Sequence, residues 1–313
     1  MMAANLIPYS PSFAGGIGSV MAANLIPYSP SFAGGIGSMM AANLIPYSPS
    51  FGGGWGEAIH QYMKTHLKIA RPDAHPEVFY SVQGEGKNLG QPSIFVRTAL
   101  CNLHCIWCDT DYTWNWKGTR FTHIRDAEPD YEKFDIKEVV AELPVEAVAG
   151  LVRQYPCKNV VLTGGEPMMQ QEGLLALMEA LGEGYWFEIE TNGTLIPEPV
   201  FDARIGQYNV SPKLANSNNP QKLREKPKAY RFFAQSPKAV FKFVVAEPQD
   251  LEEVMGLIRR YAIDPEKVYL MPEGTSEASL RAKMAWLVEV CKQHGFHFTS
   301  RLHILIYGNK RGV

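Results

Sequence analysis

The sequence predicts an α/β fold with a largely parallel sheet, preceded by a disordered tail of repeats. Two observations predict this. From about Ile59 onward, short apolar runs alternate with amphipathic stretches, which is typical of strand–helix units joined by right-handed crossovers. Before that point, a unit rich in Pro, Gly and Ser recurs with a period of 19 residues, starting at Met2, Met21 and Met40.

The repeat region, residues 1–58, is predicted to be mostly disordered. The unit MAANLIPYSPSFAGGIGS is nearly identical in its first two copies, diverges after Phe51 in the third, and carries no charge before Glu57. Such a composition does not readily form a regular helix or a long strand. The near-identity indicates a recent duplication, an engineered leader or a misassigned start, and an interaction tail with a repeated Ile-Pro-Tyr ligand is the alternative. We expect residues 59–313 to form one folded domain.

Each predicted element rests on its own pattern. Apolar runs predict strands, and Asn159–Thr163 stops at a Gly-Gly pair, as a buried parallel strand would. Longer amphipathic stretches predict helices. In chain order, we expect strands at Ser93–Thr98, Asn159–Thr163, Tyr185–Glu190, Tyr208–Val210, Val240–Val245, Val268–Met271 and Leu302–Ile306, and helices at Val145–Tyr155, Glu172–Leu181, Leu251–Tyr261 and Glu277–Cys291.

Composition excludes several classes of function. The 313 residues carry a formal net charge of −2, which predicts neither a nucleic-acid groove nor affinity for anionic membranes. No run approaches the roughly 20 apolar residues that span a bilayer. No charged segment leads into an apolar one, so secretion is not indicated. The clustered cysteines fit a reducing cytoplasm.

Three cysteines within eight residues, Cys101, Cys105 and Cys108, form a C-x3-C-x2-C run directly after the first predicted strand. Three close thiolates can hold three corners of an iron–sulfur cluster and leave one iron open to another ligand. A structural zinc site that includes His104 is the rival, but no second pair of ligands is found elsewhere in the sequence. A disulfide framework is disfavoured because five cysteines is an odd number.

A second loop, Gly164-Gly165-Glu166-Pro167, follows the strand Asn159–Thr163. Its glycines permit close backbone approach to a ligand, and the glutamate is an acceptor suited to an ammonium group. An ordinary strand-to-helix turn is the alternative. Because both loops follow parallel strands, we expect them at the same carboxyl-end rim of the sheet.

Together, the two loops resemble the radical S-adenosylmethionine (SAM) superfamily. The flanking segments FYSVQGEG (79–86), FVR (95–97), CDT (108–110) and the closing RLHILIYGNKRGV (301–313) resemble one family within it, 7-carboxy-7-deazaguanine synthase. The resemblance covers residues 77–313 and implies a partial, modified (β/α) barrel of the radical SAM type.

The resemblance also implies a reaction. SAM binds the open iron of a [4Fe–4S] cluster held by Cys101, Cys105 and Cys108, and its cleavage supplies a 5′-deoxyadenosyl radical. This radical takes a hydrogen atom from 6-carboxy-5,6,7,8-tetrahydropterin, whose ring contracts to 7-carboxy-7-deazaguanine with loss of ammonia. SAM is regenerated, a Mg2+ ion assists, and the product enters queuosine-type deazapurine biosynthesis.

Particular residues are expected to carry these roles. The planar fork of Arg97 suits a substrate carboxylate, although an ion pair is the alternative, and Gln83 offers the mixed donor and acceptor that a pterin edge needs. By resemblance, substrate contacts are Val82, Gln83, Gly84, Glu85, Arg97, Thr163, His303 and Val313, with His303 placed on the last strand. SAM contacts are Trp107, Cys108, Asp109, Gly164, Gly165, Glu166, Thr191, Ser211, Pro212, Lys213, Met271, Pro272, Glu273 and Gly274.

Thr110 is the expected Mg2+ ligand by resemblance, with a role in capping a helix as the alternative. The final residues 311–313 are expected to close over the substrate. The stretch 111–143, which contains Trp114 and Trp116, is either a docking surface or core packing.

The resemblance further implies a homodimer and a reductant such as flavodoxin or ferredoxin. The alternative functions are another radical SAM enzyme, such as a glycyl-radical activase, and a non-catalytic metal-binding module.

Overall fold

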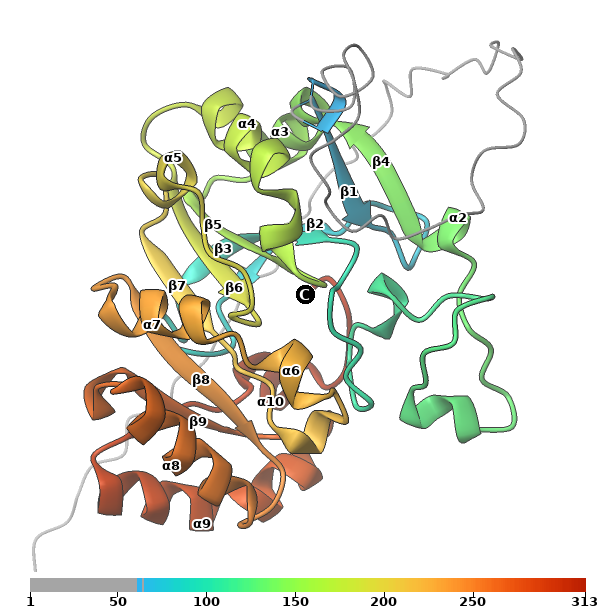
Figure 1. Cartoon of the computed structure of the whole chain (residues 1–313). Coiled ribbons are helices and arrows are strands. Elements are labelled where there is room, and N and C mark those ends of the chain that lie inside the picture. Colours follow the sequence, from blue (N-terminus) through green and yellow to red (C-terminus); the bar gives the residue numbers. More distant parts are fainter. Residues whose placement is uncertain (1–60, 64) are drawn as a thin grey trace, which may run out of the picture. The chain divides into compact units, whose positions relative to one another are not determined.

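A ten-stranded sheet organises the structure, a computed structural model that describes residues 61–63 and 65–313 (Figure 1). The strands run in the order β10–β9–β8–β7–β6–β5–β3–β1–β4, and β2 pairs with β3 outside this row. From β3 to β10 all neighbours are parallel, whereas β1 pairs antiparallel with β3 and β4. The strands are β1 (His66–Ala70), β2 (Val78–Val82), β3 (Pro92–Thr98), β4 (Val140–Pro144), β5 (Asn159–Gly164), β6 (Trp186–Thr191), β7 (Gln207–Val210), β8 (Ala239–Val245), β9 (Val268–Pro272) and β10 (His297–Phe298).

Every predicted helix is present, and every predicted strand except the last is present too, which confirms the α/β fold with its parallel sheet. The antiparallel strands β1, β2 and β4 lack a predicted counterpart, as does helix α7. The α-helices are α2 (Ile136–Val139), α3 (Val145–Arg153), α4 (Gln171–Leu181), α5 (Pro199–Asp202), α6 (Gln221–Arg224), α7 (Pro227–Gln235), α8 (Asp250–Tyr261), α9 (Glu277–His294) and α10 (Leu302–Tyr307).

The predicted last strand, Leu302–Ile306, is wrong because these residues lie in helix α10. The final place in the sheet belongs to β10, which pairs with β9. After β10 the chain leaves the sheet: the Leu302 amide donates to the carbonyl of Gly84 (2.8 Å), and the Arg301 carbonyl accepts the first bond of the helix. The periodicity of a short apolar run does not distinguish a strand from a helix. The secondary structure of these residues is therefore determined by their hydrogen bonds.

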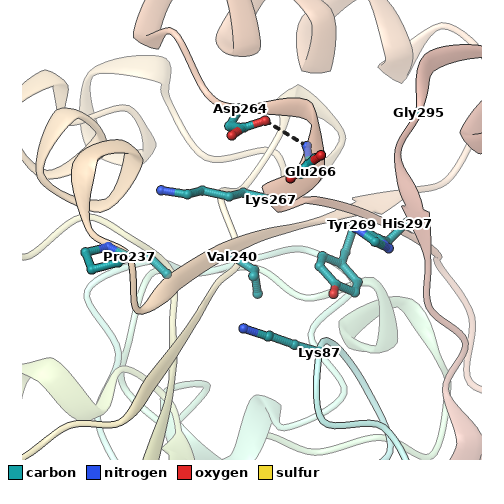
Figure 2. Close-up of a pocket in the computed structure, with 10 residues that line it drawn as sticks. Lys87, Pro237, Val240, Asp264, Glu266, Lys267, Tyr269, Gly295 and His297 are labelled. Carbon is teal, nitrogen blue, oxygen red and sulfur yellow. Dashed lines mark hydrogen bonds between the residues drawn. The ribbon is translucent and has the colours of Figure 1, made fainter.

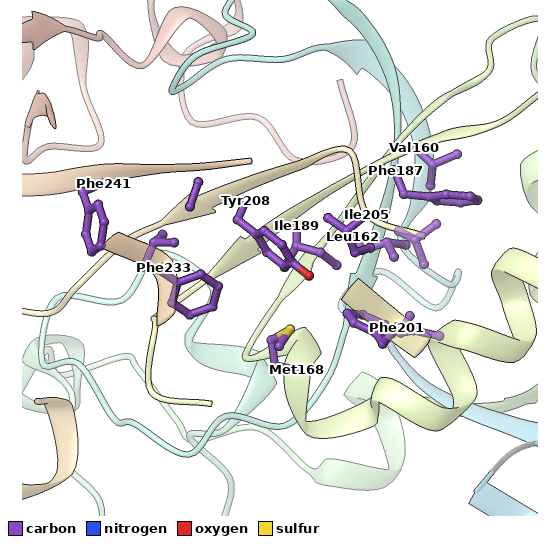
Figure 3. Close-up of a cluster of buried hydrophobic side chains, with 14 of the residues drawn as sticks. Val160, Leu162, Met168, Phe187, Ile189, Phe201, Ile205, Tyr208, Phe233 and Phe241 are labelled. Carbon is purple, nitrogen blue, oxygen red and sulfur yellow. The ribbon is translucent and has the colours of Figure 1, made fainter. Parts of the chain in front are cut away.

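The strands have one apolar and one polar face. Phe187 and Ile189 of β6 belong to the core between the sheet and the helices, part of which is drawn in Figure 3. Glu188 and Glu190 alternate with them and therefore project from the opposite face. Lys242 takes the same place in β8, whose neighbouring phenylalanines also belong to the core. The inner face of the sheet is thus unusually polar for a buried surface.

The stretch 111–143 packs against the antiparallel side of the sheet. Tyr112 forms a small buried cluster with Ala70 and Val139. Trp114 is 2% exposed, and the indole N–H of Trp116 donates to the Tyr112 carbonyl (2.8 Å). Of the two interpretations left open by the sequence, core packing therefore describes these tryptophans.

The described residues all belong to one compact unit. The prediction of a disordered repeat tail falls on residues 1–58, which lie outside the described residues. Among the helices that the structure describes, none is both long and apolar enough to cross a membrane.

Candidate active site

A cavity of about 980 Å³ lies at the carboxyl ends of the parallel strands. Figure 1 marks the C-terminus near the ends of β3 and β5, and Val313 indeed contributes to the wall. The cavity gathers nearly all predicted site residues, from loops far apart in the sequence. Its lining includes Val82, Gln83, Gly84, Glu85, Arg97, Cys101, Cys105, Trp107, Cys108, Asp109, Thr110, Thr163, Gly164, Gly165, Thr191, Ser211, Lys213, Met271, Glu273, Gly274, His303 and Val313.

Three predicted SAM contacts, Glu166, Pro212 and Pro272, are absent from the lining of this cavity. The Glu166 carboxylate is fully buried and accepts from the amides of Met168 (3.0 Å) and Asn192 (2.7 Å) and from the Thr191 hydroxyl (2.8 Å). Burial raises the pKa of Glu166 to about 7, against the opposing effect of these donors. Glu166 thus joins two loops behind the cavity wall, and the Lys213 ammonium is close enough to favour its charged form.

The glycine pair serves a close contact between loops. A Cβ at Gly164 would lie 2.0 Å from the Thr98 carbonyl oxygen, and one at Gly165 would lie 2.0 Å from the Leu100 carbonyl oxygen. The Gly165 amide donates to the Thr98 carbonyl (3.0 Å). The Gly164-Gly165 loop therefore packs backbone to backbone on the start of the cysteine loop.

The three cysteine thiols face the same cavity from one loop between β3 and the helical turn η1 (Asp111–Thr113). Burial raises the pKa of all three, that of Cys108 to about 12. Uncharged thiols would bind no metal, so metal binding must displace their protons. A set of three thiols from one short loop, beside open cavity, fits three corners of a [4Fe–4S] cluster.

His104, the histidine of the rival zinc interpretation, does not line the cavity. Its ring stacks on Phe121 (centroids 3.4 Å apart) and meets Trp114 edge-on. Burial lowers the pKa of His104 to about 4, so the ring is neutral. The histidine is thus part of the aromatic packing under the cysteine loop.

Trp107 and Lys213 form one wall beside the cysteines. The ammonium of Lys213 lies 5.8 Å from the Trp107 ring centroid and donates to the Ser211 hydroxyl (3.0 Å). An aromatic face, a cation and a hydroxyl together suit a nucleoside that carries a carboxylate. At the opposite edge, the Glu273 carboxylate is already paired with Lys283 (2.7 Å).

The inner sheet face supplies hydrogen-bonding groups. The Thr163 hydroxyl donates to Glu190 (2.6 Å), and the Gln83 amide donates to Glu190 (3.3 Å) and Glu188 (2.6 Å). Asn88 also donates to Glu188 (2.5 Å). Burial raises the pKa of Glu188 to about 7 despite these donors. Gln83 and Thr163 are thus held in fixed orientations at the cavity wall.

Arg97 projects from the end of β3, in register with Thr163 of β5. Its Nε lies 3.1 Å from the Glu77 carboxylate, which also accepts from the Tyr112 hydroxyl (2.7 Å). Within the described part of the chain, its terminal nitrogens have no hydrogen-bond or ion-pair partner. The predicted ion pair and the predicted carboxylate clamp are therefore compatible, because they use different nitrogens of one fork.

A ladder of alternating charges closes the other side. Glu85 pairs with Lys242 and with Arg301 (2.8 Å), and Arg301 also pairs with Asp109. Burial alone would raise the pKa of Glu85, but Lys242 and Arg301 outweigh it and hold this pKa well below its usual range. Asp109, a predicted SAM contact, is paired with Arg301 through its carboxylate.

Three comparisons with known proteins bear on this site. The sequence profile of the radical SAM superfamily matches residues 95–232. A 7-carboxy-7-deazaguanine synthase of Pyrobaculum aerophilum is 37% identical over 240 residues, covering 75% of this chain and 95% of that protein. Enzymes of the same name from Halobacterium salinarum and Rhodopirellula baltica are each 34% identical and are covered to 90% and 87% of their lengths.

The chain belongs to the 7-carboxy-7-deazaguanine synthase family. It is therefore an enzyme of the radical SAM superfamily, whose members use a [4Fe–4S] cluster and SAM. The crystal structure of QueE from Escherichia coli is similar, with a TM-score of 0.54 and 26% identity, and the match covers 78% of this chain and 98% of that one. This likeness confirms the predicted radical SAM type of fold.

The carboxyl-terminal segment of this 7-carboxy-7-deazaguanine synthase family member reaches back into the cavity. His303 lies on α10, not on a strand, and its ring occupies the space in which a Cβ of Gly84 would stand. The His303 ring lies 4.0 Å from Glu85. The guanidinium of Arg311 lies 4.6 Å from the centroid of the Tyr112 ring, which helps to hold the last residues at the wall.

Sequence reasoning missed Lys242, Arg301 and Tyr112, all of which line the cavity. A signal existed for Lys242. It is a charged residue inside an otherwise apolar strand, and such a residue in a strand covered by helices must face an interior polar site. No comparable pattern marks Arg301 or Tyr112, whose partners come from distant loops.

A second cavity, of about 580 Å³, lies at the amino ends of β8 and β9, away from the predicted residues (Figure 2). Asp264 accepts from the amide of Glu266 (3.0 Å), Lys267 donates to two carbonyls, and Tyr269 stacks on His297. These groups are engaged with one another and with the main chain. We therefore interpret this cavity as a structural recess and not as a binding site.

Proposed function

We propose that the larger cavity converts 6-carboxy-5,6,7,8-tetrahydropterin into 7-carboxy-7-deazaguanine with loss of ammonia, in queuosine-type deazapurine biosynthesis. The observation that carries this proposal is that one cavity is lined both by the three cysteines and by the polar groups around Arg97. Its volume of about 980 Å³ is at the upper end of the range for ligand pockets, about 300–1,000 Å³, as suits a cofactor together with a substrate.

Cys101, Cys105 and Cys108 would hold the [4Fe–4S] cluster, and Trp107 with Lys213 would contact SAM. When bound, the cluster and SAM supply a carbon-centred radical that can take a hydrogen atom from the substrate. The protein's contribution is to orient the substrate and to exclude water. Trp107 supports this role because its indole N–H is fixed by a bond to the Asn216 carbonyl (2.9 Å), which leaves the ring in one orientation.

The terminal nitrogens of Arg97 would clamp the substrate carboxylate in a bidentate pair. The Glu77 carboxylate lies 3.1 Å from Nε as an ion-pair partner and is itself fixed by the Tyr112 hydroxyl. Gln83, Thr163 and Glu190 offer the mixed donors and acceptors that a pterin edge requires. These groups are already hydrogen-bonded to one another, so little ordering is needed when the substrate binds.

Thr110 is the proposed Mg2+ ligand. It stands at the start of η1 without a capping hydrogen bond from its side chain, and its hydroxyl lies 3.5 Å from the Cys108 sulfur. A single neutral oxygen suits a hard ion that keeps several waters and draws further ligands from the substrate. We expect Thr110→Ala to raise the Mg2+ concentration that gives half-maximal turnover, whereas Thr110→Ser should retain the native requirement.

The remaining proposals concern the cellular setting. We infer a cytoplasmic enzyme that acts as a homodimer and takes electrons from a small reductant such as flavodoxin or ferredoxin. The clustered reduced cysteines support the compartment, since they persist in a reducing environment. Size-exclusion chromatography of the holoprotein tests the dimer.

The function is tested by anaerobic incubation of iron-reconstituted protein with the carboxytetrahydropterin, SAM, Mg2+ and a reductant. We expect 7-carboxy-7-deazaguanine, identified by mass and ultraviolet spectrum. Arg97→Lys should raise the KM for the pterin at least tenfold, because the fork is lost. Arg204→Lys is the control, since Arg204 bonds the Met178 carbonyl at a distant position. Accumulation of 5′-deoxyadenosine without the deazaguanine would instead indicate another radical SAM reaction.

A further inference from the structure

The cysteine loop is held from below by the short segment 215–219, which follows Lys213. The amide of Ile106 donates to the Ser217 carbonyl (3.0 Å), and the indole of Trp107 donates to the Asn216 carbonyl (2.9 Å). Both bonds fall between the second and third cysteines. The segment therefore fixes the position of the loop between Cys105 and Cys108.

Asn219 makes the most direct of these contacts. Its Nδ2 lies 3.3 Å from the Cys105 sulfur, and its Oδ1 accepts from the backbone amide of His104 (2.9 Å). The second bond fixes the orientation of the side-chain amide, because a backbone N–H can only meet the oxygen. The NH2 group must then face the sulfur. Asn219 is thus an N–H donor to one particular thiol.

The donor is rigidly mounted. Asn219 is 7% exposed, and its carbonyl accepts from Nε of the buried Arg224 (3.1 Å). Arg224 in turn donates to the Lys213 carbonyl (3.1 Å) and pairs with Glu253. The Nδ2 of Asn219 also contacts the Ser217 hydroxyl (3.2 Å). These contacts hold the side-chain amide of Asn219 in place whether the Cys105 sulfur is neutral or charged.

We propose that Asn219 tunes the reduction potential of the cluster by donating a hydrogen bond to the Cys105 thiolate. This inference rests on the proposed role of the three cysteines as cluster ligands. An N–H donor withdraws electron density from a ligating thiolate and stabilises the reduced, more negative cluster, so the potential rises. Asn219 is a positioning residue that touches neither substrate nor SAM in this scheme.

The arrangement is asymmetric among the three ligands. Among the described residues, the side chains of Thr110 and Trp114 contact Cys108, and the Thr110 hydroxyl lies 3.5 Å from the sulfur, a distance at which little hydrogen-bond strength remains. Asn219 serves Cys105 alone. The amide donor of Asn219 therefore acts on one corner of the cluster.

The test is a redox titration of the reconstituted holoprotein followed by electron paramagnetic resonance, with iron content measured in parallel. Asn219→Asp keeps the acceptor for His104 but replaces the donor with a carboxylate, and Asn219→Ala removes both. We expect wild-type iron content and a more negative midpoint in both variants. The shift should reach a tenfold change in the ratio of reduced to oxidised cluster at fixed potential, which is 59 mV for one electron.

Asn218→Asp is the matched control. Asn218 is the exposed neighbour with φ of 60°, a conformation that aspartate tolerates, so the control adds the same charge without touching the sulfur. Its midpoint should stay near that of the wild type. Unchanged midpoints in iron-loaded Asn219 variants would overturn the proposal, as would loss of iron from both variants, which would make Asn219 purely structural. Wild-type protein that binds no iron would instead refute the cluster assignment itself.

Discussion

At the scale of single residues, Arg301 joins three loops of the site. It pairs with Glu85 and Asp109 and donates to the Gly274 carbonyl (2.8 Å). Its side chain is 10% exposed, so these charges interact in an environment with little water. The loop after β2, which contains Glu85, is thereby fixed relative to the cysteine loop and to the loop after β9.

We therefore predict that Arg301→Gln lowers the free energy of unfolding by about 3 kcal/mol, because two carboxylates lose a buried partner. The same variant should raise the KM for the pterin, since Glu85 moves with its loop. Denaturant unfolding and steady-state kinetics measure the two effects. Arg281→Gln removes an exposed i,i+4 pair with Glu277 and should cost no more than about 0.5 kcal/mol. Equal losses in both variants would contradict the assigned role.

At the scale of elements, the sequence predicts the parallel strands well because their apolar runs are long and end at glycine or polar residues. Most of the predicted site residues line the cavity, since loops after parallel strands share one rim and the resemblance to a known family points to particular residues on them. The antiparallel strands β1 and β4 escape prediction because their pairing is decided by distant partners. The helix at Leu302–Tyr307 and the contact of Asn219 with Cys105 are not predicted either, because they also depend on distant partners.

The contact between the Gly164-Gly165 loop and the cysteine loop yields a second prediction. Gly164 has φ of 127°, and a Cβ there would lie 2.0 Å from the Thr98 carbonyl oxygen. Gly164→Ala should therefore cost at least about 2 kcal/mol through backbone strain and should reduce iron loading because the cysteine loop is displaced. Thermal unfolding and iron analysis measure both.

Gly150→Ala provides the control for this substitution. Gly150 lies within helix α3, and nothing stands within 4 Å of a Cβ at this position. The alanine should stabilise the protein by about 0.5–1 kcal/mol and leave iron loading unchanged. A Gly164→Ala protein that loads iron like the Gly150→Ala protein would show that the close loop contact is dispensable.

At the scale of the whole molecule, buried titratable groups shape the pH dependence of stability. Burial raises the pKa of Glu188 to about 7, whereas burial lowers the pKa of His104 to about 4. The first effect makes stability fall as pH rises from about 4.5 to 7, because the folded state then holds a proton that the unfolded state has lost. The second makes stability rise as pH increases from about 4 to 6.5, so the two partly cancel.

The contribution of Glu188 is isolated by comparing Glu188→Gln with the wild type. The stability difference between them should shift in favour of the variant between pH 4.5 and 7, by up to about 3 kcal/mol, because glutamine cannot ionise. Chemical denaturation at several pH values measures the difference. A difference that stays constant across this range would show that Glu188 is ionised throughout.

Deletion of residues 1–58 should leave turnover unchanged, because every group assigned to the reaction lies between Glu77 and Val313. Steady-state kinetics of the shortened and full chains make the comparison. A large loss of kcat in the shortened chain would assign the repeats a catalytic part.

The central claim is that one cavity holds cluster, SAM and pterin for a reaction that regenerates SAM. The most direct measurement is the number of 7-carboxy-7-deazaguanine molecules formed per SAM consumed, in anaerobic turnover of the full-length holoprotein. The account predicts a ratio well above one, because SAM is restored after each cycle. A ratio of one or less, or deoxyadenosine formed without the deazaguanine, would contradict it.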